Sequence, residues 1–203
     1  MIVPMIREKT SYTFSDFFNM GIEAEDVAAY FGYAFQARNV TLPKTTRLLE
    51  RVNDLKNRIE EGMPYVSFIN EAARREFLIA PVLLELVHYT HTKIKVEYPI
   101  TVNDQLKGTL DYYLQAKNNL LVIEAKNGDL TRGFAQLTVE LIALDQWGKT
   151  ETPTLFGAVS MGDIWRFGIL DRPSKALTQD LNLFRVPADL DELMSILVGI
   201  LER

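Results

Sequence analysis

The sequence contains no cysteine among its 203 residues, which excludes disulfide bonds and thiolate metal sites. The absence of cysteine also favours a reducing intracellular compartment. Long apolar segments are lacking too: the longest, residues 77–84, is too short to cross a bilayer, and residues 1–11 lack the apolar core of a secretory signal. We therefore expect a cytoplasmic protein without a membrane partner.

Positive charge is not in excess, since the chain has 27 acidic residues and 22 basic ones. This ratio argues against a protein that coats nucleic acid through general basicity. It leaves open a nuclease, whose bound cations neutralise phosphate charge. The basic residues within 44–58 predict either a surface that faces a phosphate backbone, or a solvated helix face or internal partner for the acidic residues within 10–36.

Several motifs of nucleotide-binding proteins and hydrolases are missing as well. The chain has no glycine-rich phosphate loop, no G-x-S-x-G elbow and no dinucleotide-binding fingerprint. His88 and His91 have the H-x-x-H spacing of metal ligands, but the sequence offers no third ligand near them. We therefore interpret both histidines as structural or solvent-facing.

The hydrophobic content of 47% is sufficient for one substantial core. Apolar spacing predicts one or two helices within residues 15–36 and an amphipathic helix over residues 45–61. The apolar stripe of the second helix comprises Leu48, Val52, Leu55 and Ile59. This stripe is expected to pack on the core of the same chain, with a dimer interface as the alternative. Residues 1–62 are thus predicted to form an N-terminal helical extension of a core formed by residues 63–203.

The core sequence predicts the order helix, three strands, helix, two strands, helix. The first helix, over residues 70–88, contains Pro81, which is expected to kink or divide it near Leu78. The other predicted elements are strands at 93–102, 107–114, 120–126, 155–161 and 164–170, and helices at 130–147 and 189–201. A helical crossover makes the third and fourth strands parallel, and hairpins add antiparallel pairs. The predicted fold class is α/β, a mixed sheet flanked by helices.

The second and third strands are predicted to form a hairpin that turns at residues 118–119, an Asn-Asn dipeptide suited to a two-residue turn. This turn would set Tyr113 opposite Glu124 and Asp111 opposite Lys126. Asp111, Glu124 and Lys126 would then project from one face. A loop one residue longer would send Asp111 to the other face, so the grouping depends on the register.

The pattern Asp111, twelve residues, Glu124, one residue, Lys126 resembles the active-site signature of the PD-(D/E)XK, or restriction-endonuclease-like, nuclease superfamily. The predicted order of elements is similar to the core of that family. Residues 71–83 resemble the helix that precedes its core strands, and residues 159–170 resemble its late hairpin. Leu110 stands where the signature has its proline, a departure that touches no metal ligand.

The resemblance implies a restriction-endonuclease-like fold and a Mg²⁺ site, with Mn²⁺ able to substitute. Asp111, Glu124 and the carbonyl of Ala125 would supply hard oxygen ligands. Lys126 would orient or help deprotonate the attacking water and offset developing negative charge. The alternative for this group is a surface-exposed strand end with an ordinary ion pair between Asp111 and Lys126.

Four further residues have weaker claims to the site. By resemblance, Glu71 would bind a metal through water, although a carboxylate at a helix N-terminus also stabilises the helix dipole. Gln136 would steady the catalytic lysine or contact a phosphate, unless it belongs with Arg132 and Glu140 to a solvent-facing stripe of its helix. Arg75 and Arg132 are candidates for contacting substrate, and an ion pair with a neighbouring carboxylate is the alternative for Arg75.

The sequence therefore predicts a Mg²⁺-dependent endonuclease that hydrolyses phosphodiester bonds in DNA. The same residues would cut RNA, so they do not decide between the two substrates. A homodimer or partner subunit would supply specificity and a second cut, since a compact acidic monomer offers little surface for sequence readout. The alternative function is a catalytically silent scaffold of the same fold that binds nucleic acid or protein.

Overall fold

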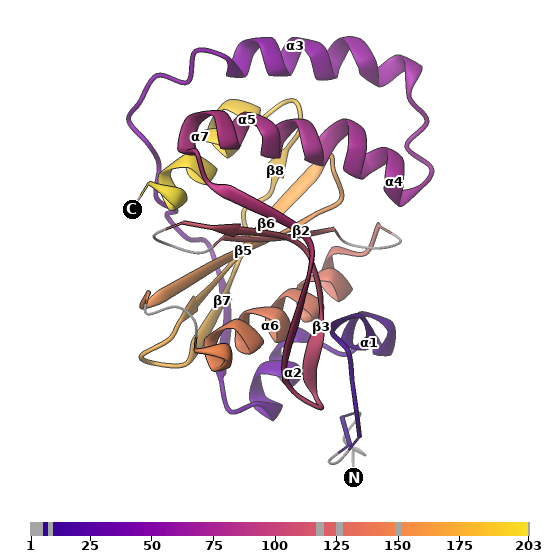
Figure 1. Ribbon diagram of the computed structural model, residues 1–203, viewed down its shortest axis with the longest axis vertical. Helices are drawn as coiled ribbons and strands as arrows, with labels where there is room; N and C mark the ends of the chain where they lie inside the picture. The colour runs from indigo at the N-terminus through magenta and orange to yellow at the C-terminus, as the bar shows by residue number, and fades with distance from the viewer. Residues whose placement is uncertain (1–5, 8–9, 117–119, 125–127, 149–151, 203) are drawn as a thin grey trace.

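The structure, a computed structural model, describes residues 6–7, 10–116, 120–124, 128–148 and 152–202, and for residues 120–124 it describes the backbone alone. These residues form a mixed α/β fold around one eight-stranded sheet (Figure 1). The strands are β1 (Ala34–Arg38), β2 (Lys93–Asn103), β3 (Leu106–Gln115), β4 (Leu120–Glu124), β5 (Thr154–Ser160), β6 (Ile164–Asp171), β7 (Ala176–Asp180) and β8 (Phe184–Arg185).

The sheet is mixed in direction. Its strand order is β1-β7-β6-β5-β4-β3-β2, with β8 beside β6. β1 is parallel to β7 and β4 is parallel to β5, whereas the other pairs are antiparallel. The predicted crossover from β4 through a helix to β5 and the predicted β5–β6 hairpin are thereby confirmed.

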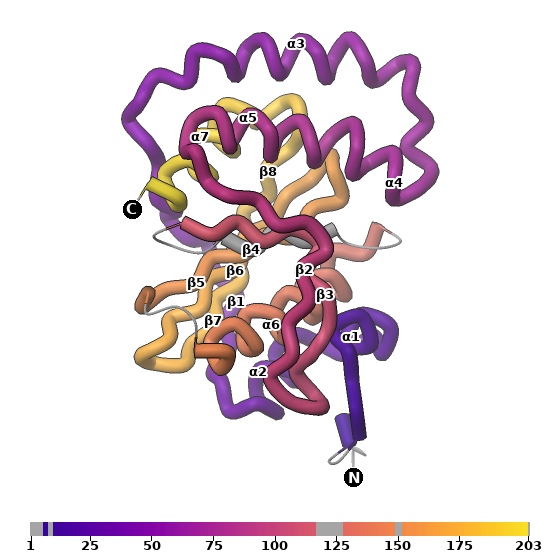
Figure 2. Tube along the Cα trace, viewed as in Figure 1, coloured from indigo at the N-terminus to yellow at the C-terminus, as the bar shows by residue number. Residues whose placement is uncertain are grey.

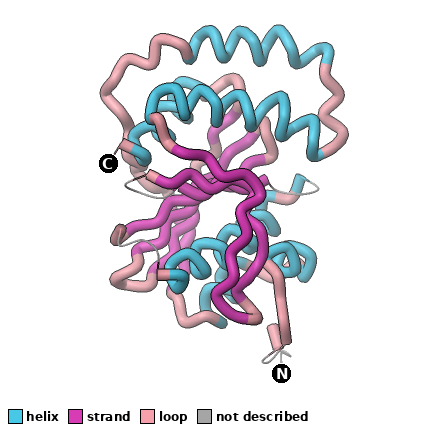
Figure 3. Tube along the Cα trace, viewed as in Figure 1, coloured by secondary structure: helices cyan, strands magenta, loops and turns pink. Residues whose placement is uncertain are grey.

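Helices cover both faces of the sheet (Figure 3). One face carries α3 (Val52–Gly62), a 3₁₀ turn (Met63–Tyr65), α4 (Glu71–Arg74), α5 (Ala80–Thr90) and α7 (Leu190–Leu201). The other face carries α1 (Phe14–Met20), α2 (Ala24–Tyr30) and α6 (Leu130–Trp147). In the trace of Figure 2, α3 forms the outermost layer beyond α5, and α6 lies on the opposite side of the sheet.

The two faces bury separate apolar clusters. The α5-side cluster joins the first helical layer to the sheet through residues such as Leu55, Ile59, Leu83, Leu86, Trp165, Phe167, Leu193 and Leu197. The α6-side cluster joins the second layer to the sheet through residues such as Phe14, Phe17, Val27, Leu110, Phe134, Leu137, Leu141, Leu155 and Leu170. Those apolar side chains of the sheet that belong to a cluster can therefore be assigned to a face.

α6 is buried all round because the sheet covers one side of it and α1 and α2 pack against another. It begins at Asp129, whose side chain accepts a hydrogen bond from the backbone N–H of Arg132 at 3.0 Å, and it ends at Gly148 with a φ of +69°. The predicted boundaries, residues 130 and 147, are confirmed. Every residue from 133 to 144 is buried.

The predicted helix over residues 70–88 is interrupted, as Pro81 led us to expect. Asn70 caps α4 through a 2.8 Å hydrogen bond from the backbone N–H of Ala73. A π-helical turn, Arg75–Ile79, then separates α4 from α5. Pro81 has no N–H to donate to the preceding turn, which accounts for the loss of regular hydrogen bonding just before it.

The N-terminal part of the chain differs from the predicted helical extension in two respects. Residues 34–36, predicted as the end of a helix, belong instead to the edge strand Ala34–Arg38, which pairs with β7. The amphipathic helix begins at Val52 rather than at residue 45, and Leu48 is 84% exposed instead of contributing to the stripe. Val52, Leu55 and Ile59 do pack on the core of the same chain. Pairing with β7, more than a hundred residues away in sequence, decides the conformation of residues 34–38.

Candidate functional site

The β2–β3 hairpin changes the face of the sheet toward which its side chains point. Tyr112 and Leu114 belong to the α5-side cluster, whereas Leu106 and Leu110 belong to the α6-side cluster. Residues two apart on a regular strand share a face, so the alternation of β3 breaks between Leu110 and Tyr112. The residue at this break is Asp111, which is half-buried.

Glu97 lies at the corresponding point of β2. The pairs Val96–Tyr112 and Tyr98–Leu110 bracket it, so Glu97 lies across from Asp111. Its φ is +50°, a left-handed value that residues other than glycine rarely adopt. The hairpin therefore has a local irregularity on both strands at the position of Asp111.

The register of β3 and β4 corrects the predicted pairing. Tyr113 lies opposite Leu121 rather than Glu124, and Leu114 lies opposite Leu120. A longer connection than the predicted two-residue turn therefore joins the paired positions, and the turn at residues 118–119 falls outside the described residues. In a regular strand, this shift by an odd number of residues would send Asp111 to the face opposite the one predicted. Because the alternation of β3 breaks at Asp111, however, the register alone does not give the direction of its side chain.

Glu124 is the last residue of β4, and its backbone pairs with Ser160 of β5. It thus lies at the carboxyl end of the parallel pair β4–β5, whose two strands α6 connects. The side chain of Glu124 and all of Ala125 and Lys126 lie outside the described part of the chain. Their convergence with Asp111, and the alternative Asp111–Lys126 ion pair, therefore stay predictions.

A cavity of about 410 Å³ separates the interrupted helix from the β2–β3 hairpin. Among the described residues its lining comprises Glu71, Ala72, Arg75, Glu76, Ala80, Glu97 and Tyr112. The structure thus brings two predicted site residues, Glu71 and Arg75, together beside the strand neighbour of Asp111. The cavity is rich in carboxylates, and Arg75 is the one basic side chain among its described lining residues.

Arg75 contacts both strands of the hairpin from this cavity. Its Nε donates a hydrogen bond to the Tyr112 hydroxyl at 3.3 Å, and its guanidinium carbon lies 5.2 Å from the centre of the Tyr112 ring. Its Nη1 lies 3.6 Å from Oε1 of Glu97. The structure therefore contains the ion pair with a neighbouring carboxylate that was the alternative to a substrate contact for Arg75.

Stacked aromatic residues lie on the other face of the hairpin. The rings of Tyr98 and Tyr113 are 5.6 Å apart and nearly parallel, and Nζ of Lys95 lies 4.2 Å from the Tyr98 ring centre. Burial, followed by the nearby Tyr98, raises the pKa of Tyr113 above its ordinary value. The Tyr113 hydroxyl therefore stays protonated at neutral pH, and we assign this group to packing.

The predicted site residues of α6 lie on the opposite face of the sheet from Glu71 and Arg75. Gln136 is 4% exposed and its Nε2 donates a 2.9 Å hydrogen bond to Oε1 of Glu140, which is also buried. The interpretation of Gln136 and Glu140 as a solvent-facing stripe is therefore wrong. Arg132 is half-exposed and pairs with Asp129 at 3.2 Å.

Sequence reasoning did not identify Glu97 or Tyr112 as site residues. Tyr112 has one signal, its position beside Asp111. Glu97 has none, because nothing in the local sequence marks a glutamate that adopts a left-handed conformation within a strand. Both residues become visible only when the interrupted helix is packed against the hairpin.

The predicted donor set suits Mg²⁺ by its chemistry, since carboxylate and carbonyl oxygens are the hard ligands that this ion prefers. Asp111 contributes to it from a half-buried position that neither apolar cluster includes. Within the described residues, no group of three or more His, Asp or Glu side chains is arranged to hold a metal ion. Two predicted ligand atoms, from Glu124 and Ala125, belong to the undescribed part of the site.

The histidines agree with their structural interpretation. His91 ends α5 in a left-handed conformation, with a φ of +51°. His88 has its Nε2 3.9 Å from Oε1 of Glu50, in an exposed position. His91 thus terminates α5, and His88 makes a contact on the surface.

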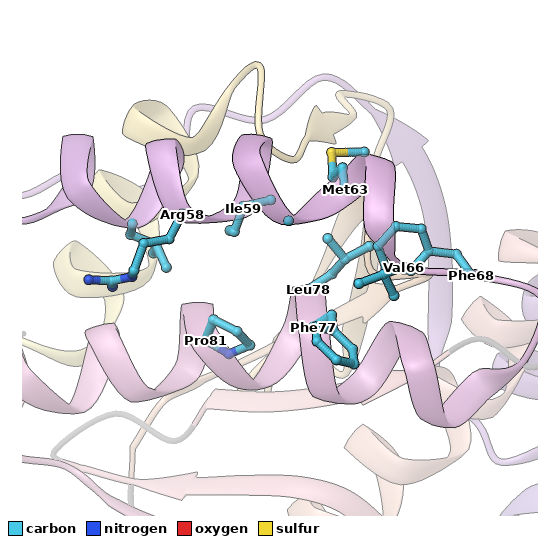
Figure 4. A pocket seen from close by; sticks show the side chains of 10 residues that line it. Arg58, Ile59, Met63, Val66, Phe68, Phe77, Leu78 and Pro81 are labelled. Atoms are coloured by element: carbon cyan, nitrogen blue, oxygen red, sulfur yellow. The ribbon is translucent and has the colours of Figure 1, made fainter.

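A second cavity, of about 230 Å³, lies between α3 and the start of α5 (Figure 4). Its lining is apolar apart from Arg58, and it includes Leu55, Ile59, Met63, Val66, Phe68, Phe77, Leu78 and Pro81. No carboxylate lines this cavity among the described residues. The acidic cavity, by contrast, has three carboxylates among its described lining residues and lies beside Tyr112, the neighbour of Asp111.

No protein-family model matches the chain, and no significantly similar curated protein or solved structure is found. Across the described ranges, every helix is too short or too polar to cross a membrane. The fold is thus defined at the level of a mixed α/β sheet with helices on both faces.

Proposed function

We propose that the chain is a Mg²⁺-dependent nuclease that hydrolyses phosphodiester bonds in nucleic acid, with DNA as the expected substrate. The observation that carries the proposal is the position of Asp111, half-buried where the β2–β3 hairpin changes face and one strand away from the end of β4. The Glu124-x-Lys126 tripeptide begins at that end, before α6. This arrangement, together with the spacing of the three residues, supports a restriction-endonuclease-like site.

Some of the residues would bind the metal ion and one would activate the attacking water. The carboxylates of Asp111 and Glu124 and the carbonyl of Ala125 would hold Mg²⁺. When bound, the ion would supply positive charge against the negative charge that develops on the phosphate oxygens. Lys126 would orient the attacking water, help remove its proton and add a second positive charge.

Glu71 and the neighbouring cavity support this assignment. Glu71 is the first residue of α4 and lines the acidic cavity that also contains Tyr112, the strand neighbour of Asp111. From there its carboxylate would contact the metal through water. Gln136, on the other face of the sheet, is hydrogen-bonded to Glu140, so we propose that it supports the packing of α6 and does not contact phosphate.

A cleavage assay tests the proposal. The protein is incubated with Mg²⁺ or Mn²⁺ and single- or double-stranded DNA and RNA, alongside Asp111→Ala, Lys126→Ala and the control Asp104→Ala. Asp104 lies on the same hairpin but is exposed in its turn, paired with Lys107 at 3.2 Å. We expect cleavage by the wild type and the control, and none by the other two variants.

The contrary result is equally specific. Equal cleavage by the wild type and all variants would trace the activity to a contaminant. No cleavage by any of them, with nucleic acid still bound, would favour the catalytically silent scaffold.

A further inference from the structure

Two consecutive arginines attach the interrupted helix to two different hairpins. Arg74 pairs with Asp163 at 3.0 Å, in the turn between β5 and β6. Arg75, the first residue of the π-helical turn, instead reaches Tyr112 and Glu97 in the β2–β3 hairpin. The start of the helix is thus fixed to both hairpins by adjacent side chains.

The contacts of Arg75 bracket Asp111. Tyr112 follows Asp111 in β3, and Glu97 lies across from Asp111 on β2. One guanidinium group therefore spans both strands at the position where alternation breaks and where Glu97 adopts its left-handed φ. Its rigid, planar set of donors allows an arginine to make these contacts together, which the single ammonium of a lysine does not reproduce.

The charge around Arg75 argues against a main role in binding phosphate. Glu71, Glu76 and Glu97 line the same cavity, so the described lining has three carboxylates and one guanidinium. Without a bound cation to offset them, these carboxylates outweigh the single guanidinium and would repel a phosphate, so Arg75 does not make the cavity a phosphate site by itself. The Arg75 side chain is only 21% exposed, and its guanidinium contacts Glu97 and Tyr112.

We propose that Arg75 is a positioning residue for the metal site. By holding Tyr112 and Glu97, it fixes the hairpin where it changes face and thereby fixes the direction of the Asp111 carboxylate. This inference rests on the proposed function, in which Asp111 is a metal ligand. Groups that orient metal ligands in this way commonly change metal affinity when they are removed.

The test compares Arg75→Met with Arg75→Lys, Tyr112→Phe and the control Arg185→Met. Arg185 is also paired with a carboxylate, Asp189 at 2.8 Å, but it belongs to β8, away from the β2–β3 hairpin. The dissociation constant of Mn²⁺ is measured by calorimetry, and hydrogen exchange is measured at the backbone amides of β2 and β3. Thermal unfolding checks that each variant is folded.

We expect Arg75→Met to weaken Mn²⁺ binding by about tenfold or more and to speed exchange around Asp111. Arg75→Lys should recover part of the affinity, because it keeps a positive charge near Glu97. Tyr112→Phe, which removes only a hydroxyl and is expected to fold, should weaken binding by a smaller factor. Arg185→Met should bind Mn²⁺ as the wild type does.

Two outcomes would overturn the inference alone. If Arg75→Met folds and binds Mn²⁺ with wild-type affinity, the contact does not position Asp111. If Arg75→Met does not fold, wild-type affinity in Tyr112→Phe leads to the same conclusion. Weaker binding of nucleic acid with unchanged Mn²⁺ affinity would make Arg75 a substrate contact instead. A wild-type protein that binds no Mn²⁺ would overturn the proposed function as well, and that result needs no variant.

Discussion

Tyr33, Asp145 and Arg172 form a polar network away from the candidate site. The Tyr33 hydroxyl donates a hydrogen bond to Oδ2 of Asp145 at 2.6 Å, and Nε of Arg172 donates to Oδ1 of the same carboxylate at 2.6 Å. The network joins the residue before β1 to the last turn of α6 and to the residue after β6. Burial of the ring, and next the hydrogen bond to Asp145, raise the pKa of Tyr33 to about 12.

This raised pKa predicts that the protein loses stability at alkaline pH. The stabilising contribution is complete below the ordinary tyrosine pKa of 10.0, which applies to the unfolded chain, and is lost as the pH rises toward 12. The reason is that the unfolded chain ionises first. Urea unfolding between these pH values should therefore give a falling free energy of unfolding.

The variant Tyr33→Phe isolates this group. It should lower the free energy of unfolding at neutral pH by about 1–3 kcal/mol, because it removes a buried hydrogen bond to a charged partner. It should also flatten the alkaline decline. Tyr65→Phe, at a tyrosine that is 89% exposed, is the control and should change neither. An equally steep decline in Tyr33→Phe would assign the pH dependence to other groups.

Single residues were predictable from sequence only where spacing carries information. Asp111 is a candidate because its distance from Glu124 and Lys126 matches the restriction-endonuclease-like signature, and its role stays a prediction. Glu97 was not identified, since its role depends on a left-handed conformation and on Arg75 from another element. Gln136 was identified as a candidate, but its burial depends on α1 and α2 covering α6, which periodicity did not indicate.

At the scale of elements, α7 and the segment before α3 approach each other closely. The backbone N–H of Thr45 donates to the carbonyl of Ser195 at 3.0 Å. A Cβ added to Gly199 would lie 2.7 Å from backbone atoms of Lys44 and Thr45. Gly199 therefore allows this extended segment to pack directly on the helix.

Replacing Gly199 by alanine should destabilise the protein although alanine favours helices. The helix preference contributes about 1 kcal/mol in favour of alanine. Overpacking against a backbone costs about 1–3 kcal/mol or more, because the backbone cannot rotate away as a side chain would. We expect the overpacking cost to exceed the gain in helix preference, so the midpoint of thermal unfolding should fall.

Gly62→Ala is the matched control for this substitution. Gly62 ends α3 with helical dihedral angles, and a Cβ added there would meet no atom within 4 Å. It should be neutral or stabilising by up to about 1 kcal/mol. Equal effects of the two substitutions on thermal unfolding would contradict the proposed close packing of α7.

Elements were predictable where their pattern is local. The β5–β6 hairpin, α6 and α7 follow from turn residues, caps and apolar periodicity, and all three are confirmed. Three strands were missed. β1 is stabilised by pairing with β7, far away in sequence, and β7 and β8 are short strands that pair with β6 after the predicted order of two strands had ended. The register of β3 and β4 was wrong because the Asn-Asn dipeptide at residues 118–119 suggested a shorter connection than the observed pairing allows.

At the scale of the whole molecule, the first 62 residues are integrated into both layers. They provide β1 at the edge of the sheet, α1 and α2 against α6, and α3 outside α5 and α7. Phe14, Phe17 and Val27 are buried in the α6-side cluster, and Leu55 and Ile59 in the α5-side cluster. Both clusters would be incomplete without this segment.

A chain restricted to residues 63–203 should therefore fail to fold cooperatively. Its sheet would lose an edge strand, and the apolar face of α6 that α1 and α2 cover would be exposed to water. Circular dichroism during thermal unfolding, compared with the full chain, measures this. A sharp transition at a similar temperature would instead mean that residues 1–62 are a dispensable extension.

The central claim is that Asp111 is a ligand of a divalent metal. Titration of Mn²⁺ by calorimetry into the wild type, Asp111→Asn and the hairpin control Asp104→Asn tests it most directly, since asparagine keeps the shape of the side chain and removes its charge. We predict that the wild type and Asp104→Asn bind Mn²⁺ with the same affinity and that Asp111→Asn loses the site. Equal binding by all three proteins, or no binding by the wild type, would contradict the claim.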